Sequence, residues 1–259
     1  MTPLVIVKVG ESIPALIPEL GDYEDWIRAG LGALERPLVV IDPRRGETLP
    51  EPDALSAAIV TGSHAMVTER EAWSERTGHW LARLIDQAIP VLGICYGHQL
   101  LAQACGGEVG YHPRGIEIGT TIIGTSAAAT DDALFSAMPA FFPAQTVHRQ
   151  TVLRLPRGAV ALAANDFEPH HAFRIGGNAW GVQFHPEFSA DAMRGYIEHL
   201  DASLRREARD PGSLIKAVTA TPEAASLLRI FARITGGAER FDTKASRRPP
   251  NSGDAAPPV

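Results

Sequence analysis

Short apolar runs alternate with longer amphipathic stretches over the first hundred residues of the chain. Four runs predict buried β-strands, at 4–9, 38–41, 57–61 and 90–94. Three stretches have helical spacing or composition, at 22–34, 69–87 and 96–104. Strands and helices in this order predict βαβ units, and therefore an α/β fold with an open, mostly parallel sheet covered by helices on both faces. Residues 10–21 contain two prolines and are expected to form a loop.

The pattern changes after Gly106, where short β-rich segments are separated by Pro, Gly, Asn and Asp. These segments are 116–125, 142–148, 159–165, 171–175 and 180–185. They predict an antiparallel extension of the sheet. A short helix is expected within 130–138, and a longer one from Ser189 to about Arg209.

A last helix is predicted to begin at the Thr-Pro-Glu sequence of residues 221–223. Its apolar stripe is expected to dock on the core rather than to recruit a partner, and consists of Ala224, Leu227, Leu228, Phe231 and Ile234. The final twenty residues contain four prolines and little apolar content. We therefore expect one domain at 1–205, a helical extension packed on it at 206–238, and a disordered tail at 239–259.

Composition and charge narrow the class of protein. The 259 residues are 45% hydrophobic and carry a net charge of −6, which suits a globular domain and offers no basic field for nucleic acid or an anionic membrane. No stretch approaches the roughly 20 apolar residues of a membrane-spanning helix, and the first residues lack a signal-peptide pattern. The two cysteines, Cys95 and Cys105, are too far apart to bridge if a helix joins them. We expect a reducing compartment, the cytoplasm.

The apolar run at 90–94 ends on a cysteine that lies between two glycines. Gly93 and Gly97 are small enough for a sharp turn from strand to helix, which would expose Cys95 as the nucleophile elbow of hydrolases exposes serine. The N-terminus of the following helix would favour the thiolate. Cys95 is therefore a candidate nucleophile, and a small buried apolar residue is the alternative.

A candidate base lies ninety residues later, in the sequence His185-Pro186-Glu187. If this segment is extended, His185 and Glu187 point to the same side, so the carboxylate can orient the imidazole. An oxyanion formed by attack of Cys95 on an acyl carbon needs N–H donors. The residue after the nucleophile, Tyr96, offers one, and Gly62 at the end of a neighbouring strand offers the other.

Together these motifs resemble the class I, triad-type glutamine amidotransferase family, and are particularly similar to the glutaminase domain of GMP synthases. The resemblance rests on Gly93-Ile94-Cys95-Tyr96-Gly97-His98-Gln99 and Gly181-Val182-Gln183-Phe184-His185-Pro186-Glu187, and extends from about 55 to 193. It implies a flavodoxin-like fold and hydrolysis of the glutamine side-chain amide through a γ-glutamyl thioester. It also implies a Cys95, His185 and Glu187 triad, an oxyanion hole at Gly62 and Tyr96, and no metal or organic cofactor.

The resemblance further implies that Gln99 and His148 contact the substrate. Family members often carry a Ser-His-x-Asp-like element where this chain has Val147-His148-Arg149-Gln150. Glu117 matches a position used near the site, and we leave it open between structure and function. We leave His64 open between the pocket mouth and a solvated loop. The adjacent residues His170 and His171 should point to opposite faces of a strand, which argues against their binding one metal ion together.

Three functions remain open at this stage. The first is a glutaminase that hands ammonia to a separate synthetase, because the residues after Arg209 are too few for the synthetase half of a GMP synthase. The second is a γ-glutamyl peptidase or hydrolase, which would use the same triad on a γ-glutamyl peptide or conjugate. The third is a non-catalytic regulatory subunit on the same fold.

Overall fold

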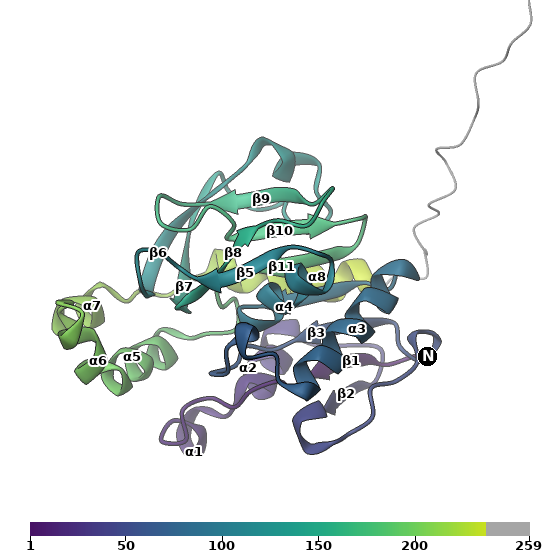
Figure 1. Cartoon of the computed structure of the whole chain (residues 1–259), viewed down its shortest axis with the longest axis horizontal. Coiled ribbons are helices and arrows are strands. Elements are labelled where there is room, and N and C mark those ends of the chain that lie inside the picture. The colour runs from purple at the N-terminus through teal and green to yellow at the C-terminus, as the bar shows by residue number, and fades with distance from the viewer. Residues whose placement is uncertain (237–259) are drawn as a thin grey trace, which may run out of the picture.

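A nine-stranded mixed sheet organises the described part of the chain, residues 1–236 of this computed structural model (Figure 1). Its strand order is β2-β1-β3-β4-β11-β10-β9-β6-β7. The strands at one end are β1 (Leu4–Val7), β2 (Leu38–Ile41), β3 (Ala57–Val60), β4 (Val91–Ile94) and β11 (Ala179–Val182). Strands β1 to β4 pair in parallel, as the four apolar runs predicted. Strand β11 comes from the segment 180–185, which was expected in the antiparallel extension; it pairs in parallel with β4 and antiparallel with β10.

The other end of the sheet is antiparallel and is built by the later β-rich segments. It consists of β10 (Ala172–Ile175), β9 (Val160–Ala164), β6 (Glu117–Thr125) and β7 (Phe141–His148). A separate two-stranded ladder of β5 (Glu108–Tyr111) and β8 (Gln150–Arg154) was not predicted. The predicted α/β fold with an antiparallel extension is confirmed.

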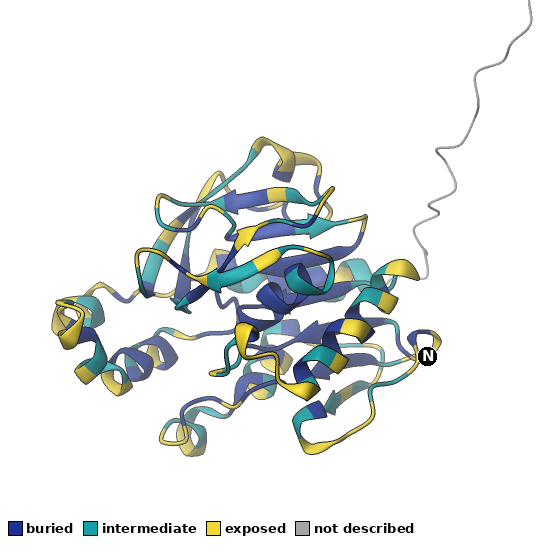
Figure 2. Cartoon of the chain, in the orientation of Figure 1, coloured by how far each residue is buried: buried dark blue, intermediate teal, exposed yellow. Residues whose placement is uncertain are grey.

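Helices cover both faces of the parallel part. On one face lie α2 (Tyr23–Leu31) and α8 (Pro222–Gly236), and on the other α3 (Ala72–Asp86) and α4 (Tyr96–Ala104). Strand β1 is apolar throughout because both of its faces are buried. Leu4 and Ile6 face α2 and α8, whereas Val5 and Val7 face α3 and α4. Figure 2 shows these central strands as the most buried part of the chain.

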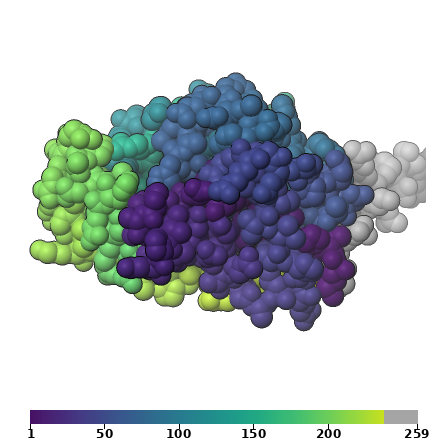
Figure 3. Space-filling view, turned by 90° about the horizontal axis from the view of Figure 1, so that it is seen from below, coloured from purple at the N-terminus to yellow at the C-terminus, as the bar shows by residue number. Residues whose placement is uncertain are grey.

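A third apolar cluster lies outside the sheet. It joins α1 (Ile17–Leu20) and the start of α2 to α5 (Ala190–His199), α6 (Asp201–Arg206) and α7 (Pro211–Ala217). In the view from below, the purple N-terminal segment lies against the green segment of these later helices (Figure 3). This cluster holds the N-terminal loops beside the carboxyl ends of the parallel strands.

Several short elements differ from the prediction. The loop at 10–21 contains the single helical turn α1, and the helix expected from Ser189 to Arg209 is two helices, because Leu200 leaves the helical conformation at φ −90°, ψ 5°. The segment at 130–138 holds only the end of a 3₁₀ helix, η4 (Ala127–Asp131). There the Asp132 carboxylate accepts the amides of Leu134 and Phe135, a local bond that competes with helix formation. Three further 3₁₀ turns are η1 (Pro43–Arg45), η2 (Pro52–Ala54) and η3 (Val67–Glu69).

The C-terminal helix α8 packs on the sheet through its apolar stripe. Four of its residues are buried in the core with α2, namely Ala224, Leu227, Leu228 and Phe231. The expected extension at 206–238 runs two residues beyond the described range, and the expected tail at 239–259 lies wholly outside it. No helix among residues 1–236 is long and apolar enough to cross a membrane.

Candidate active site

Cys95 occupies the turn between β4 and α4. Its backbone has φ 50° and ψ −97°, a region that side-chain-bearing residues rarely adopt and that costs about 1–3 kcal/mol. A Cβ at Gly93 would lie 2.4 Å from the Gly97 carbonyl oxygen, and a Cβ at Gly97 would lie 2.6 Å from the Val60 carbonyl oxygen. Both glycines are therefore required for α4 to lie this close to β4 and β3. The local geometry is that of a nucleophile elbow.

The Cys95 side chain faces a cavity of about 180 Å³. The thiol is 3.7 Å from the Val147 carbonyl oxygen of β7, which it can use as an acceptor. Four of the predicted site residues share this cavity with Cys95, namely Tyr96, Gln99, His148 and His185. Gly62 and Glu187 are not among its lining residues, but each lies next to one of them: Gly62 to Cys95 and His185, and Glu187 to His185. The carboxyl ends of β3 and β4 thus meet the β7 and β11 ends at one pocket, as expected for an open α/β sheet.

His185 is held beside this cavity by both its backbone and its ring. Its amide donates to the Gln145 carbonyl oxygen at 2.8 Å, and its Nδ1 donates to Oε1 of Glu187 at 2.7 Å. Nε2 is buried and has no hydrogen-bond partner within normal distance among the described residues. Burial lowers the pKa of His185, but the charges of Glu187 and Cys95 outweigh it and raise that pKa to about 10. The raised pKa favours the imidazolium form of the ring beside the Cys95 sulfur.

Gly62 brings the base and the nucleophile close together. A Cβ at this position would lie 3.1 Å from Cε1 of His185 and 3.8 Å from Cβ of Cys95. The Gly62 carbonyl is turned away from them, because it accepts the hydroxyl of Thr61 at 2.9 Å. Among the described residues neither the Gly62 amide nor the Tyr96 amide, the first of α4, has an acceptor. These two N–H groups are the donors that the sequence proposed for an oxyanion.

On the opposite side of Cys95, the two expected substrate contacts converge on one carbonyl. Nε2 of Gln99 donates to the Gln150 carbonyl oxygen at 2.7 Å, and Nδ1 of His148 donates to the same oxygen at 3.0 Å. Arg149 points to the rim, where it pairs with Glu207 at 2.6 Å. The Val147-His148-Arg149-Gln150 element therefore lines the pocket, with Gln150 acting through its main chain.

Glu117 is the buried anion behind this wall. Its Oε2 lies 2.9 Å from Nε2 of His148 and 3.3 Å from Nε2 of His171, and its Oε1 accepts Asn165 at 2.8 Å. Burial raises the pKa of Glu117, but His148 and His171 outweigh it and hold that pKa well below its usual value. Both ring nitrogens of His148 thus face acceptors, Glu117 on one side and the Gln150 carbonyl oxygen on the other. Glu117 thus positions His148 and does not reach the cavity.

The two histidines adjacent in sequence point apart. His171 faces Glu117, whereas Nδ1 of His170 donates to the Val152 carbonyl oxygen at 2.7 Å. Both precede β10, outside the strand, and their rings contact different partners.

Two tyrosines that the sequence did not single out complete the cavity. Tyr23 stacks on His185 with ring centroids 6.4 Å apart, and its hydroxyl is 2.7 Å from that of Tyr196. The Tyr196 hydroxyl also lies 3.3 Å from Ser12 Oγ and 3.3 Å from Nε2 of His64. His64 thus lines the cavity while remaining exposed to solvent. The tyrosines come from α2 and α5, and no local motif marks either of them.

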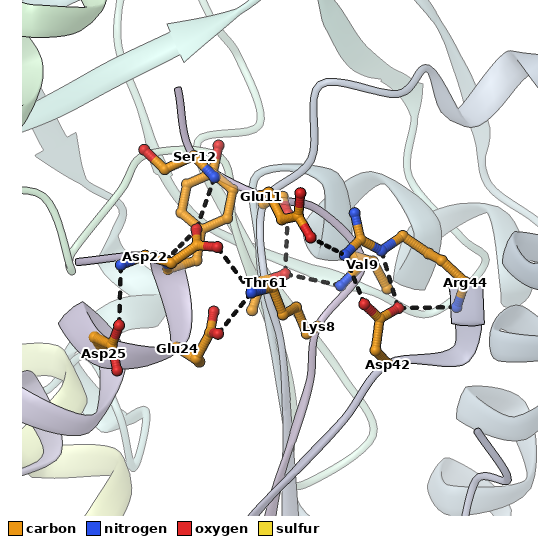
Figure 4. Close-up of polar contacts among 12 residues, drawn as sticks. Lys8, Val9, Glu11, Ser12, Asp22, Glu24, Asp25, Asp42, Arg44 and Thr61 are labelled. Carbon is orange, nitrogen blue, oxygen red and sulfur yellow. Dashed lines mark hydrogen bonds and ion pairs between the residues drawn. The ribbon is translucent and has the colours of Figure 1, made fainter. Parts of the chain in front are cut away.

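A buried ion cluster fixes the loop that follows β1 (Figure 4). Nζ of Lys8 lies 2.7 Å from Asp22 and 2.6 Å from Glu24. Asp22 also accepts the amide of Ser12 at 2.7 Å and caps α2, which carries Tyr23. The loop at 9–12 is therefore tied to the helix that supplies one wall of the cavity.

Comparison with known proteins identifies the family of the chain and two of its relatives. Residues 52–200 match the sequence model of the family described as glutamine amidotransferase class-I. The chain is 35% identical over 172 residues to the glutamine-hydrolysing GMP synthase of Aeropyrum pernix, which covers 66% of this chain and 29% of that protein. It is 29% identical over 150 residues to γ-glutamyl peptidase 5 of Arabidopsis thaliana, which covers 57% of this chain and 60% of the peptidase. The chain thus matches less than two thirds of either relative.

The fold has close counterparts among solved structures. A crystal structure of a glutamine amidotransferase from Thermotoga maritima superposes with a TM-score of 0.71 at 23% identity, covering 90% of this chain and 97% of that one. At this identity the likeness shows the fold.

Proposed function

Because the chain belongs to the class-I glutamine amidotransferase family, we propose that it hydrolyses γ-glutamyl amides through a thioester on Cys95. The observation that carries this proposal is the strained elbow of Cys95 beside the buried His185–Glu187 pair. A cysteine, an imidazolium and an orienting carboxylate, with two free N–H groups across from them, are the parts that acyl transfer requires.

In the proposed first half-reaction, the Cys95 sulfur attacks the γ-carbonyl carbon of the substrate. The Gly62 and Tyr96 amides stabilise the negative charge that develops on the carbonyl oxygen. When the carbon–nitrogen bond breaks, the leaving amine takes the Nε2 proton of His185, and a γ-glutamyl thioester remains. Neutral His185 then accepts a proton from water as the water attacks the thioester, and glutamate leaves with the Cys95 thiolate restored.

For the glutamyl half of the substrate, we propose contacts on the Gln99 and His148 side of Cys95. Both side chains line the cavity with Cys95, and His148 is held in place by Glu117 and by the Gln150 carbonyl oxygen. Polar side chains fixed in this way can orient the polar end of a glutamyl group.

Glutamine is the first candidate substrate, with its ammonia delivered to a separate synthetase. The 35% identity to a glutamine-hydrolysing GMP synthase, of which this chain matches 29%, supports this candidate. We propose the cytoplasm as its compartment, because both cysteines are free thiols in the structure.

Larger γ-glutamyl amides are the second candidate, and a specific observation favours them. A groove of about 400 Å³ adjoins the cavity and shares residues with it, which a reaction that releases only ammonia does not require. The identity to a γ-glutamyl peptidase is compatible with this reading.

The test is a panel of γ-linked substrates with and without candidate synthetases. We expect glutamate release that is lost in Cys95→Ala and preserved in Cys105→Ala, the matched control at the other cysteine. Absence of any Cys95-dependent turnover across the panel would favour the non-catalytic regulatory subunit. Turnover that appears only when a synthetase is added would identify the ammonia-donating candidate.

A further inference from the structure

We propose that the groove beside the cavity is a subsite for the leaving amine, and that it fits an amine whose distal end carries a second, positively charged ammonium group. This inference rests on the proposed function, because it names the substrate class of the same site. It concerns the part of the substrate beyond the scissile amide bond.

The groove and the cavity adjoin each other. Four residues line both of them, namely Ser63, His64, Ala65 and His199. The groove holds about 400 Å³ against about 180 Å³ for the cavity, so it is the larger of the two. The groove is therefore the neighbouring space for a group that extends beyond the cavity on this side.

The groove also lies on the correct side of the nucleophile. His185 must deliver its proton to the leaving nitrogen, so that nitrogen lies on the His185 side of the acyl carbon. Tyr23 stacks on His185, Tyr196 bonds to Tyr23, and His64 bonds to Tyr196 at the mouth of the groove. Gln99 and His148 stand on the other side and do not line the groove. The leaving amine is thus the half of the substrate that faces the groove.

The charges of the groove favour a cation. Its charged lining residues are Glu11, Glu71 and Arg44. Arg44 is engaged by Asp42 at 2.6 Å and by Glu11 at 3.3 Å, so its guanidinium is not free to receive a carboxylate (Figure 4). Glu71 is exposed and forms no ion pair with any residue in the range 1–236, and the Trp73 ring lines the same groove. An unpaired carboxylate next to an aromatic face is a combination that attracts an alkylammonium group.

The walls of the groove are held rigidly. A Cβ at Gly10 would lie 2.5 Å from Cα of Ser63 and 2.7 Å from the Gly62 carbonyl oxygen, so the loop at 9–12 is pressed against the strand end that carries Gly62. The Lys8–Asp22 pair and the bond from the Val9 amide to Thr61 fix the same loop (Figure 4). A preformed subsite spends little binding energy on ordering its own walls.

The test compares three γ-glutamyl amides of matched length, made from butylamine, diaminobutane and aminobutyrate. Their distal groups are a methyl, an ammonium and a carboxylate. We expect kcat/KM to be about fivefold higher for the ammonium than for the methyl, and lowest for the carboxylate, as for a partly exposed ion pair. In Glu71→Gln the ammonium-to-methyl ratio should fall to near one. In the matched control Glu69→Gln, a neighbouring carboxylate outside the groove, the ratio should be unchanged.

Two outcomes separate this inference from the proposed function. If glutamine is hydrolysed through Cys95 while all three longer amides are rejected, or if the carboxylate is preferred, the subsite is wrong and the proposed function stands. If no amide is turned over through Cys95, the proposed function fails. The subsite is then tested separately, by measuring the affinities of the three amides for the Cys95→Ala variant by calorimetry. Equal affinities for the ammonium and carboxylate amides would then overturn it.

Discussion

Gly97→Ala tests whether the elbow controls the reaction. Gly97 is the third residue of the turn from β4 into α4, and its Cα faces β3. The added methyl would lie 2.6 Å from the Val60 carbonyl oxygen and 2.8 Å from Cβ of Val60. Both atoms belong to a strand paired on each side, so the start of α4 is the part that must move.

The displacement and its cost follow from these distances. To reach ordinary contact at 3.4 Å from the Val60 carbonyl oxygen, the start of α4 must recede by about 0.8 Å. The same movement carries the Tyr96 amide and the Cys95 side chain. A misplacement near 1 Å costs about a hundredfold in rate. Overpacking costs about 1–3 kcal/mol of stability, and the higher helix propensity of alanine returns about 1 kcal/mol.

The assay is kcat/KM for glutamate release together with urea unfolding. Gly78→Ala is the matched control, because Gly78 lies inside α3 and its added Cβ would meet Cδ1 of Leu100 at an ordinary 3.5 Å. We expect Gly97→Ala to lose about a hundredfold in kcat/KM with a stability loss of about 0–2 kcal/mol. Gly78→Ala should keep its activity and gain up to about 1 kcal/mol. Wild-type kcat/KM in folded Gly97→Ala would refute the role given to the elbow.

Three further predictions concern the groups around the site. Glu187→Gln removes one of the two charges that raise the pKa of His185 to about 10, while burial still lowers it. The alkaline limb of the kcat/KM profile should therefore move to lower pH, and an unmoved limb would count against the pair. Because the pKa of Glu117 is held below 4.5 in the folded state, its stabilising contribution is present above pH 4.5 and lost on acidification. Glu117→Gln should cost about 3–5 kcal/mol at pH 7 and flatten the dependence of Tm on acidic pH, whereas parallel Tm curves would contradict this. Phe231→Ala should cost about 3–5 kcal/mol in urea unfolding, because Phe231 is fully buried against Trp180, and a loss below about 1 kcal/mol would show that α8 is not part of the core.

The elbow and the His-Pro-Glu segment could be predicted because each is local. The need for small residues around Cys95 follows from a turn of five residues, and the proximity of His185 to Glu187 follows from their separation of two. The first four parallel strands could also be predicted, because burial on both faces requires continuous apolar runs in the sequence.

The rest of the site depends on register between distant strands. Glu117 lies directly opposite His148 because β6 and β7 pair in one register, and a shift of one residue would send the two side chains to opposite faces. Tyr23 and Tyr196 meet because the third apolar cluster joins α2 to α5. Neither arrangement has a signature within a short window, so the sequence alone could place these residues on elements but not together.

The most direct test of the central claim is labelling by an electrophile that mimics glutamine, with the modified residue located by mass spectrometry. Cys105 is the internal comparison, because burial and nearby Asp86 raise the pKa of its thiol to about 11. We predict modification of Cys95 at neutral pH, protection by glutamine or a γ-glutamyl amide, and an unmodified Cys105. Modification of Cys105 with Cys95 untouched would contradict the account.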